Sequence, residues 1–239
     1  MDPEYGRAYR ELFERHWWWR ARSALVLEVL RRHVPRGGWP AILDVGCGDG
    51  LFFPDLAEFG VATGIEPDAS LVSEATLKTG RVLIRPFDAS LQPGTSYNLI
   101  LFLDVLEHLP DPVGALRHAR SLLAPGGTIL VTVPAFRALW TAHDDWNHHR
   151  TRYTRATLLT EMSEAGLTPG ESFYFFNWVA PVKLAVRLAE ALSPSQPRPA
   201  SVPAAPVNEA LYHVSRLEAR TLTRMKLPFG SSICAVASA

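Results

Sequence analysis

One short segment near the start of the chain constrains the fold more than any other. Residues 41–45 form an apolar run around Asp44, which is typical of a buried strand. The run ends in Gly46-Cys47-Gly48-Asp49-Gly50, and a stretch that can form a helix follows. Glycine lets the backbone approach a ligand closely, and a strand, a glycine loop and a helix in this order bind nucleotide-like ligands. The segment therefore predicts an α/β fold with a ligand site at the end of its first strand.

The positions around the glycines narrow the type of ligand. Dinucleotide sites carry a third glycine three positions after the second, where this chain has Leu51, and they cradle a pyrophosphate. Asp44 would repel a pyrophosphate but suits a cationic ligand. Glu66, at the end of the next strand, can accept hydrogen bonds from ribose hydroxyls. The pair favours S-adenosylmethionine, which bears an ammonium and a sulfonium; the alternative is that Asp44 satisfies loop amides and Glu66 is a solvated acid.

Strands and helices alternate along the chain. The sequence predicts strands at 41–45, 61–65, 81–84, 98–103, 128–133, 173–177 and 232–237 and helices at 9–33, 51–59, 68–80, 112–123, 154–166, 179–192 and 207–225. Such alternation favours a mostly parallel, doubly wound sheet with helices on both faces. We expect a single domain over 1–239, made of an N-terminal helical cap (1–36), a cofactor-binding core (37–177), a helical insertion (178–228) with a proline-rich linker (193–206), and the final strand (229–239).

Three motifs, at 43–50, 104–112 and 125–128, resemble those of class I S-adenosylmethionine-dependent methyltransferases. The resemblance implies a seven-stranded, Rossmann-like sheet in the order 3-2-1-4-5-7-6 with an antiparallel last strand, for which 232–237 is the candidate. It also implies a set of cofactor-binding residues: Asp44, Gly46, Cys47, Gly48, Gly50, Glu66, Pro67, Asp88, Ala89, Leu103 and Asp104. Within this set, the Asp88 carboxylate would hold the adenine amine.

A narrower resemblance covers nearly the whole chain. The segments 16–22, 139–144, 148–154 and 227–231 are similar to a bacterial branch of methyltransferases related to ubiquinone-type O-methyltransferases. This resemblance implies methyl transfer to a small-molecule, glycan or lipid-linked acceptor, with oxygen as the expected site. The tryptophans at 17–19 form either a lid over the cofactor or a helix face that covers a sheet edge. Two other function classes stay open, a Rossmann oxidoreductase and a protein that binds S-adenosylmethionine without catalysis and acts in regulation or assembly.

Two histidines are candidate bases for a hydroxyl acceptor. His108 follows the fourth strand, at the sheet edge where α/β folds bind ligands; the alternative is a packing role. His143, oriented by Asp144, is the second candidate. Asp104, Glu107 and His108 also resemble a metal cluster of some ubiquinone-type enzymes, but helix capping explains these acids equally well, and we expect no metal.

The segment 140–153 is expected to form the acceptor side of the site. It is dense in aromatic, His and Asp residues, which is unusual for a loop that only connects two elements. Trp140, Trp146, His148 and Tyr153 are the expected substrate-binding residues. The alternative is a loop of exposed polar residues with a tyrosine docked on the core.

Composition limits the partners and the compartment. The chain has 24 basic and 24 acidic residues, so we expect no nucleic-acid partner. Cys47 and Cys234 are expected to be free thiols in a reducing cytoplasm, and the first residues lack the features of a secretory signal. The most apolar window, 173–192, gathers its charges on one helical face; we therefore expect no transmembrane segment, and peripheral membrane contact stays open. Composition gives no oligomeric state.

Overall fold

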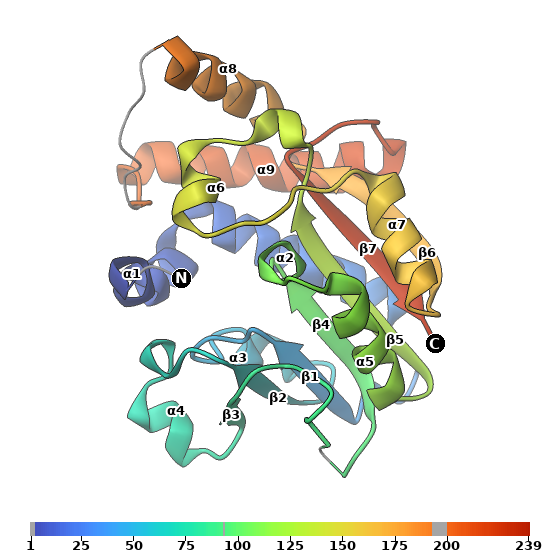
Figure 1. The fold of residues 1–239 in the computed structure, drawn as a ribbon. Helices are drawn as coiled ribbons and strands as arrows, with labels where there is room; N and C mark the ends of the chain where they lie inside the picture. Colours follow the sequence, from blue (N-terminus) through green and yellow to red (C-terminus); the bar gives the residue numbers. More distant parts are fainter. Residues whose placement is uncertain (1–2, 93, 193–199) are drawn as a thin grey trace.

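A seven-stranded sheet forms the centre of the molecule (Figure 1). The computed structural model describes residues 3–92, 94–192 and 200–239. The strands are β1 (Ala41–Val45), β2 (Val61–Glu66), β3 (Val82–Ile84), β4 (Tyr97–Leu103), β5 (Leu123–Pro134), β6 (Thr168–Phe175) and β7 (Ser232–Ser238). Their order is β3-β2-β1-β4-β5-β7-β6; β7 is antiparallel to both neighbours, and the other neighbouring pairs are parallel. The predicted sheet and its order are confirmed.

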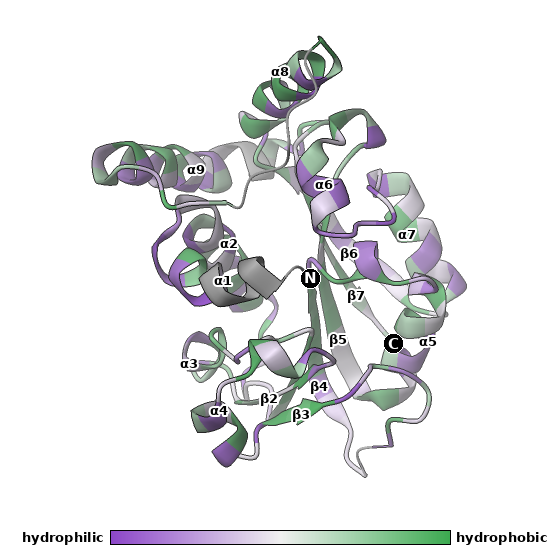
Figure 2. Cartoon of the chain, turned by 60° about the vertical axis from the view of Figure 1, so that its left-hand side comes forward, coloured by the Kyte–Doolittle hydropathy of each residue, from purple (hydrophilic) through white to green (hydrophobic). Residues whose placement is uncertain are grey.

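Helices cover both faces of the sheet. They are α1 (Pro3–Arg15), α2 (Trp17–His33), α3 (Phe53–Leu56), α4 (Glu74–Lys78), α5 (Pro112–Leu122), α6 (Ala142–Trp146), α7 (Arg155–Glu164), α8 (Val179–Leu192) and α9 (Ala205–Met225), with short 3-10 helices η1 (Ala69–Leu71), η2 (Leu106–His108) and η3 (Arg137–Leu139). Figure 2 shows α1, α2 and α9 on one side of the strands and α5 and α7 on the other. The predicted insertion is present as α8 and α9, between β6 and β7. Of its proline-rich linker, 193–199 lie outside the described residues, and α9 already begins at Ala205.

Alternate residues of β4 build the two halves of the core. Leu99 and Leu101 belong to the cluster that contains the buried face of α2, whereas Ile100 and Phe102 belong to the cluster that contains α5 and α7. All four side chains are fully buried. A strand that is apolar on both faces is what a parallel sheet between two helical layers requires.

The N-terminal helix is broken where the sequence predicts one continuous helix over 9–33. His16 has extended backbone angles (φ −75°, ψ 132°) and caps α2, with its side chain accepting a hydrogen bond from the Trp18 amide at 3.1 Å. Asn208 of α9 accepts a hydrogen bond from the first amide of α2 at 2.9 Å and donates one to the last carbonyl of α1 at 2.8 Å. A distant helix therefore satisfies both ends of the break, which local sequence does not reveal.

The helix predicted over 68–80 is also broken. Asp68 caps only η1, because Val72 has extended backbone angles. Ser73 then caps α4. The Asp49 carboxylate of the glycine loop accepts hydrogen bonds from the Ser73 amide and hydroxyl at 2.8 and 2.9 Å. The break thus ties the segment after β2 to the loop after β1.

The insertion helix α8 is amphipathic rather than uniformly apolar. Arg187 and Glu190 turn toward the body of the molecule and bond to the segment 137–142. The helix projects from the body of the molecule (Figure 1), and apolar side chains such as Leu188, which is 59% exposed, remain open to solvent. Among the residues that the structure describes, no helix has both the length and the apolar character needed to cross a membrane.

Candidate active site

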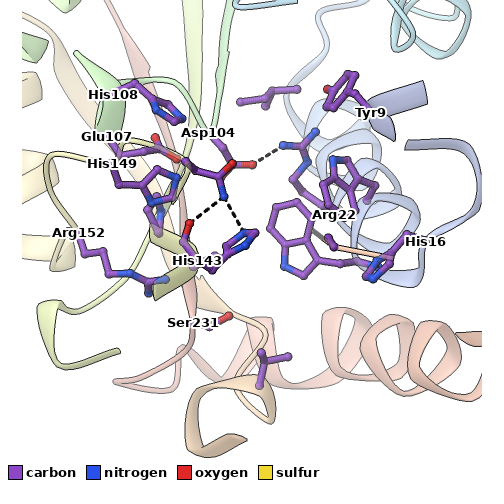
Figure 3. A pocket seen from close by; sticks show the side chains of 18 of the residues that line it. Tyr9, His16, Arg22, Asp104, Glu107, His108, His143, His149, Arg152 and Ser231 are labelled. Carbon is purple, nitrogen blue, oxygen red and sulfur yellow. Dashed lines mark hydrogen bonds and ion pairs between the residues drawn. The ribbon is translucent and has the colours of Figure 1, made fainter. Parts of the chain in front are cut away.

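A cavity of about 410 Å³ lies at the carboxyl edge of the parallel strands (Figure 3). Its walls come from the loops that follow β1, β2, β4 and β5, from α1 and α2 on one side, and from α6 and α8 on the other. The tryptophans at 17–19 line it. Ligands of open α/β sheets bind at this edge, so the cavity is the candidate active site.

The glycine loop forms one end of the cavity with its backbone. Gly46 and Gly48 line the cavity and have positive φ angles of 71° and 52°. A side chain at Gly46 would place its Cβ 2.7 Å from a methyl group of Val105. The Gly48 amide donates a hydrogen bond to the Glu66 carboxylate at 3.0 Å. These contacts explain why glycine is needed here and how the loop is joined to the end of β2.

Two buried carboxyl groups mark the same end. Asp44 is 4% exposed and Glu66 is 5% exposed. Burial raises the pKa of Asp44 to about 7, against the opposing charge of Arg22, and burial also raises the pKa of Glu66 above its usual value. A ligand that carries positive charge would offset this cost, whereas a pyrophosphate would add repulsion. The acids therefore fit S-adenosylmethionine. Asp44 and Cys47 line a smaller hollow, which shares Tyr9, Arg22, Gly46 and Leu103 with the cavity.

The N-terminal helices cover this end. Tyr9 of α1 lies against the glycine loop, and burial raises its pKa to about 12. Arg10 forms an ion pair with Asp49 of the loop. Arg22 of α2 forms an ion pair with Asp104, which follows β4 and has a positive φ of 58° (Figure 3). Two ion pairs thus hold the helical cap against the sheet edge.

The predicted cofactor residues divide into two groups. Those that line the cavity or its adjoining hollow are Asp44, Gly46, Cys47, Gly48, Glu66, Leu103 and Asp104. Gly50, Pro67, Asp88 and Ala89 are not among the described residues that line either space. Asp88 is exposed, and its carboxylate accepts hydrogen bonds from the Ser90 amide and hydroxyl at 2.8 and 2.6 Å. A role for Asp88 in holding the adenine stays a prediction.

Three histidines line the opposite end of the cavity (Figure 3). Burial lowers the pKa of His108 and of His143 to about 4, so both rings are neutral at pH 7. The His108 and His149 rings meet edge to face, with 4.8 Å between their centroids. Neutral imidazole can accept a proton, and the structure thus brings both predicted histidines to one site and adds His149.

The sequence predicts that Asp144 orients His143, but in the structure the Asp144 carboxylate bonds to His149. Its fully buried carboxylate accepts hydrogen bonds from His149 Nδ1 at 2.8 Å, from Arg152 Nε at 2.7 Å and from the Thr141 amide at 2.9 Å. Burial alone would raise the pKa of Asp144, but the hydrogen bonds from His149 and Arg152 and the charge of Arg152 hold it well below its usual value. The side chain turns inward because it also closes the N-terminus of α6 as a capping box.

The four residues predicted to bind the acceptor are not among the described residues that line the cavity. Trp140 faces a shallow outer hollow and donates its indole N–H to Asp145 at 2.9 Å. Trp146 packs against α1 and α2. His148 is exposed, and Tyr153 is 2% exposed within the core. This placement corresponds to the alternative interpretation, polar loop residues with a tyrosine docked on the core.

Glu107, His108 and His149 form a group that could hold a metal ion. Their ligand atoms lie within 4.8 Å of one another. Glu107 is 1% exposed, burial raises its pKa well above the usual value, and no described residue is a hydrogen-bond partner of its Oε2. One carboxylate and two imidazoles suit several divalent metals. Asp104 of the cluster considered from sequence pairs with Arg22 instead.

Sequence reasoning missed His149, Arg152 and Lys183 as site residues. His149 and Arg152 lie within 148–154, a segment that carries part of the narrower resemblance. This resemblance is the sequence signal that could have identified them as site residues. Lys183 belongs to the insertion, and its place in the cavity depends on how α8 returns to the site. No local pattern indicates that return.

The sheet order, the glycine loop and the paired acids define the class I methyltransferase fold. The model of the methyltransferase domain family matches residues 8–171, a span that includes the glycine loop, both buried acids and the histidine segment. The chain therefore belongs to this family. Its fold is that of the class I S-adenosylmethionine-dependent methyltransferases.

Named relatives are distant. The ubiquinone biosynthesis O-methyltransferase of Xanthomonas campestris pv. campestris (strain B100) is 37% identical over 100 residues, which cover 38% of this chain and 41% of that protein. The protein of the same name from Coxiella burnetii (strain RSA 331 / Henzerling II) is 24% identical over 144 residues, which cover 52% of this chain and 62% of that protein. A crystal structure of an S-adenosylmethionine-dependent methyltransferase from Archaeoglobus fulgidus has a TM-score of 0.55 at 20% identity and covers 91% of this chain and 94% of that one. The chain thus matches about two fifths to three fifths of the length of these curated relatives, and the structural likeness shows the fold.

Proposed function

We propose that this enzyme transfers a methyl group to a hydroxyl oxygen of a small-molecule acceptor at the histidine end of the cavity, with His149 as the base. One observation carries the proposal. The buried Asp144 carboxylate holds Nδ1 of His149, while the His149 ring lines the cavity. A histidine oriented by a buried carboxylate is a common arrangement for proton transfer.

S-adenosylmethionine, when bound, supplies an electrophilic methyl group on a positively charged sulfur. Asp44 and Glu66 would hold the positive end and the ribose, and the aromatic wall at 17–19 would exclude water from the reacting atoms. The acceptor oxygen would take the methyl group as the carbon–sulfur bond of the donor breaks, and His149 Nε2 would accept the hydroxyl proton. His108, neutral because burial lowers its pKa, meets the His149 ring edge to face and is a second candidate acceptor.

The names of the relatives support oxygen as the methylated atom, since both are O-methyltransferases. Glycan and lipid-linked hydroxyl compounds belong to the same chemical class of acceptor. Cys47 and Cys234 are buried free thiols, which fits a reducing compartment such as the cytoplasm.

A metal-assisted reaction is the second candidate, favoured by the Glu107 oxygen that has no partner among the described residues. Glu107, His108 and His149 would hold the ion. A divalent cation there would lower the pKa of the acceptor hydroxyl.

The test is transfer of tritium from methyl-labelled S-adenosylmethionine to a metabolite extract, with the products separated by chromatography. His149→Gln should lower transfer at least about 100-fold, the lower bound for loss of general-base catalysis. His148→Gln, at the exposed neighbouring position, should retain wild-type transfer. Cofactor affinity should be unchanged in both variants. Equal transfer by the two variants would refute His149 as the base, and absence of any labelled product with the wild-type protein would refute the proposed reaction.

A further inference from the structure

Lys183 is the basic residue that the insertion contributes to the cavity. It lines the cavity together with Val179 and Val186, which precede and follow it by four and three positions and share one face of α8. The same helix contacts η3 (Figure 1), where Arg187 donates a hydrogen bond to the Arg137 carbonyl at 2.9 Å. This contact, one helical turn beyond Lys183, anchors α8 to the segment that leads into α6.

The two arginines that line the cavity among the described residues both have partners. Arg22 pairs with Asp104, and Arg152 pairs with Asp144. By contrast, no carboxylate in residues 3–92, 94–192 and 200–239 lies within 4.0 Å of the Lys183 ammonium, and no hydrogen bond to it is formed there. A cation enclosed in a cavity without a counter-charge is costly.

The energetics of Lys183 agree with this geometry. Burial, together with the positive charge of Arg152, lowers its pKa to about 8, and the negative charges of Asp144 and Asp104 oppose this shift. At pH 7 the ammonium is still mostly charged, and an anion beside it would recover the lost solvation. Ser231 and Ser232 line the same cavity and offer hydroxyl groups to further anion oxygens.

We propose that Lys183 binds an anionic group of the acceptor and thereby makes the enzyme selective for organic acids over their neutral analogues. The inference rests on the proposed function, because it assumes that the acceptor enters this cavity. The apolar side chains of Val179 and Val186 beside the ammonium fit an acceptor whose acid group is attached to an apolar body. Carboxylates and phosphates share the chemistry, and the probes below separate them.

The experiment uses the full chain saturated with S-adenosylhomocysteine and measures binding by calorimetry. The probes are two matched pairs, benzoate with benzamide and phenyl phosphate with phenol. The wild-type protein should bind at least one anion tenfold or more tightly than its neutral partner. Lys183→Met should reduce that preference to threefold or less, and Lys183→Arg should retain most of it. Lys78→Met, at an exposed position on α4, is the matched control and should behave as wild type.

A second measurement detects anion binding that is too weak for calorimetry. Each anion, at tens of millimolar, should slow the modification of Lys183 by trinitrobenzenesulfonate, followed by peptide mass spectrometry, while the rate at Lys78 stays constant. The proposal is overturned if no anion protects Lys183 from modification. It is also overturned if the wild-type protein shows no preference for the anions over their neutral partners, or if Lys183→Met retains that preference. S-adenosylhomocysteine affinity and tritium transfer, measured on the same samples, report separately on the proposed function.

Discussion

Replacing Asp144 with Asn should strongly destabilise the protein. The Asp144 carboxylate is fully buried, and Arg152, which it pairs with at 2.7 Å, is 6% exposed. Asn keeps the shape but removes the charge, so the Arg152 guanidinium is left in the interior without a counter-ion. Removing one partner of a buried ion pair costs about 3–5 kcal/mol. For a chain of this size, about 1 kcal/mol shifts Tm by roughly 2–4 °C, so Tm should fall by roughly 6–20 °C.

Thermal unfolding followed by circular dichroism measures this effect. Asp145→Asn is the matched control, because Asp145 is exposed and its carboxylate accepts one hydrogen bond, from Trp140; its Tm should stay near wild type. Since the pKa of Asp144 is held well below its usual value, the carboxylate stays charged from pH 6 to 8 and the deficit should be constant there. The stabilisation is lost only in acid, below the unfolded-state pKa of about 3.9. Equal Tm shifts in the two variants would refute the argument.

Three further predictions concern the cofactor, pH and metal. Asp44→Asn should weaken S-adenosylmethionine binding at least tenfold, or about 1.4 kcal/mol, in calorimetry. Asp145→Asn, at an exposed position, should leave it unchanged, and equal losses in the two variants would contradict the assignment of Asp44. Because burial lowers the pKa of His108 to about 4, the unfolded chain binds a proton between pH 6.5 and 4 that the folded chain does not. The free energy of unfolding should therefore decrease as the pH is lowered through this window, by up to about 1.4 kcal/mol per pH unit. In urea unfolding, His108→Gln should show a smaller dependence of this free energy on pH, and an unchanged dependence would count against burial as the cause. Dialysis against EDTA should leave methyl transfer within twofold, whereas a loss restored by added Mg²⁺ or Mn²⁺ would favour the metal-assisted reaction.

Strands such as β1, β2 and β4 could be predicted because each is a short apolar run closed by glycine or an acid. β6 runs from Thr168 to Phe175 rather than over the predicted 173–177, because its first half is polar and lacks the apolar pattern. The residues of β4, for example, fill both faces of the sheet, and no other element type suits that pattern at this length. The helix breaks could not be predicted in the same way. Asn208 stabilises the break before α2, and Asp49 stabilises the break before α4. Each of these residues is far from the break in sequence, so local propensity does not contain the information.

The two ends of the cavity differ in predictability for a physical reason. The cofactor end consists of strand ends and the loops directly after them, so Asp44 and Glu66 lie where their strands place them. The acceptor end depends on which side chains of 140–153 turn inward. The Asp144–Arg152 ion pair decides this, since it brings His149 into the cavity while Tyr153 fills the core. The composition of 140–153 therefore indicated that this segment belongs to the site, but tertiary contacts determine which of its side chains line the cavity.

This difference in construction also separates cofactor binding from acceptor choice. The glycine loop and its acids belong to the sheet and are joined by backbone hydrogen bonds such as that from Gly48 to Glu66. Lys183, in contrast, stands on a helix that contacts the rest of the site through the segment 137–142. A substitution at Lys183 therefore changes the charge at the acceptor end without altering any contact that holds the cofactor end. Acceptor preference can change along α8 while the cofactor site stays intact, which is why unchanged S-adenosylhomocysteine affinity in Lys183→Met is a required part of the proposal.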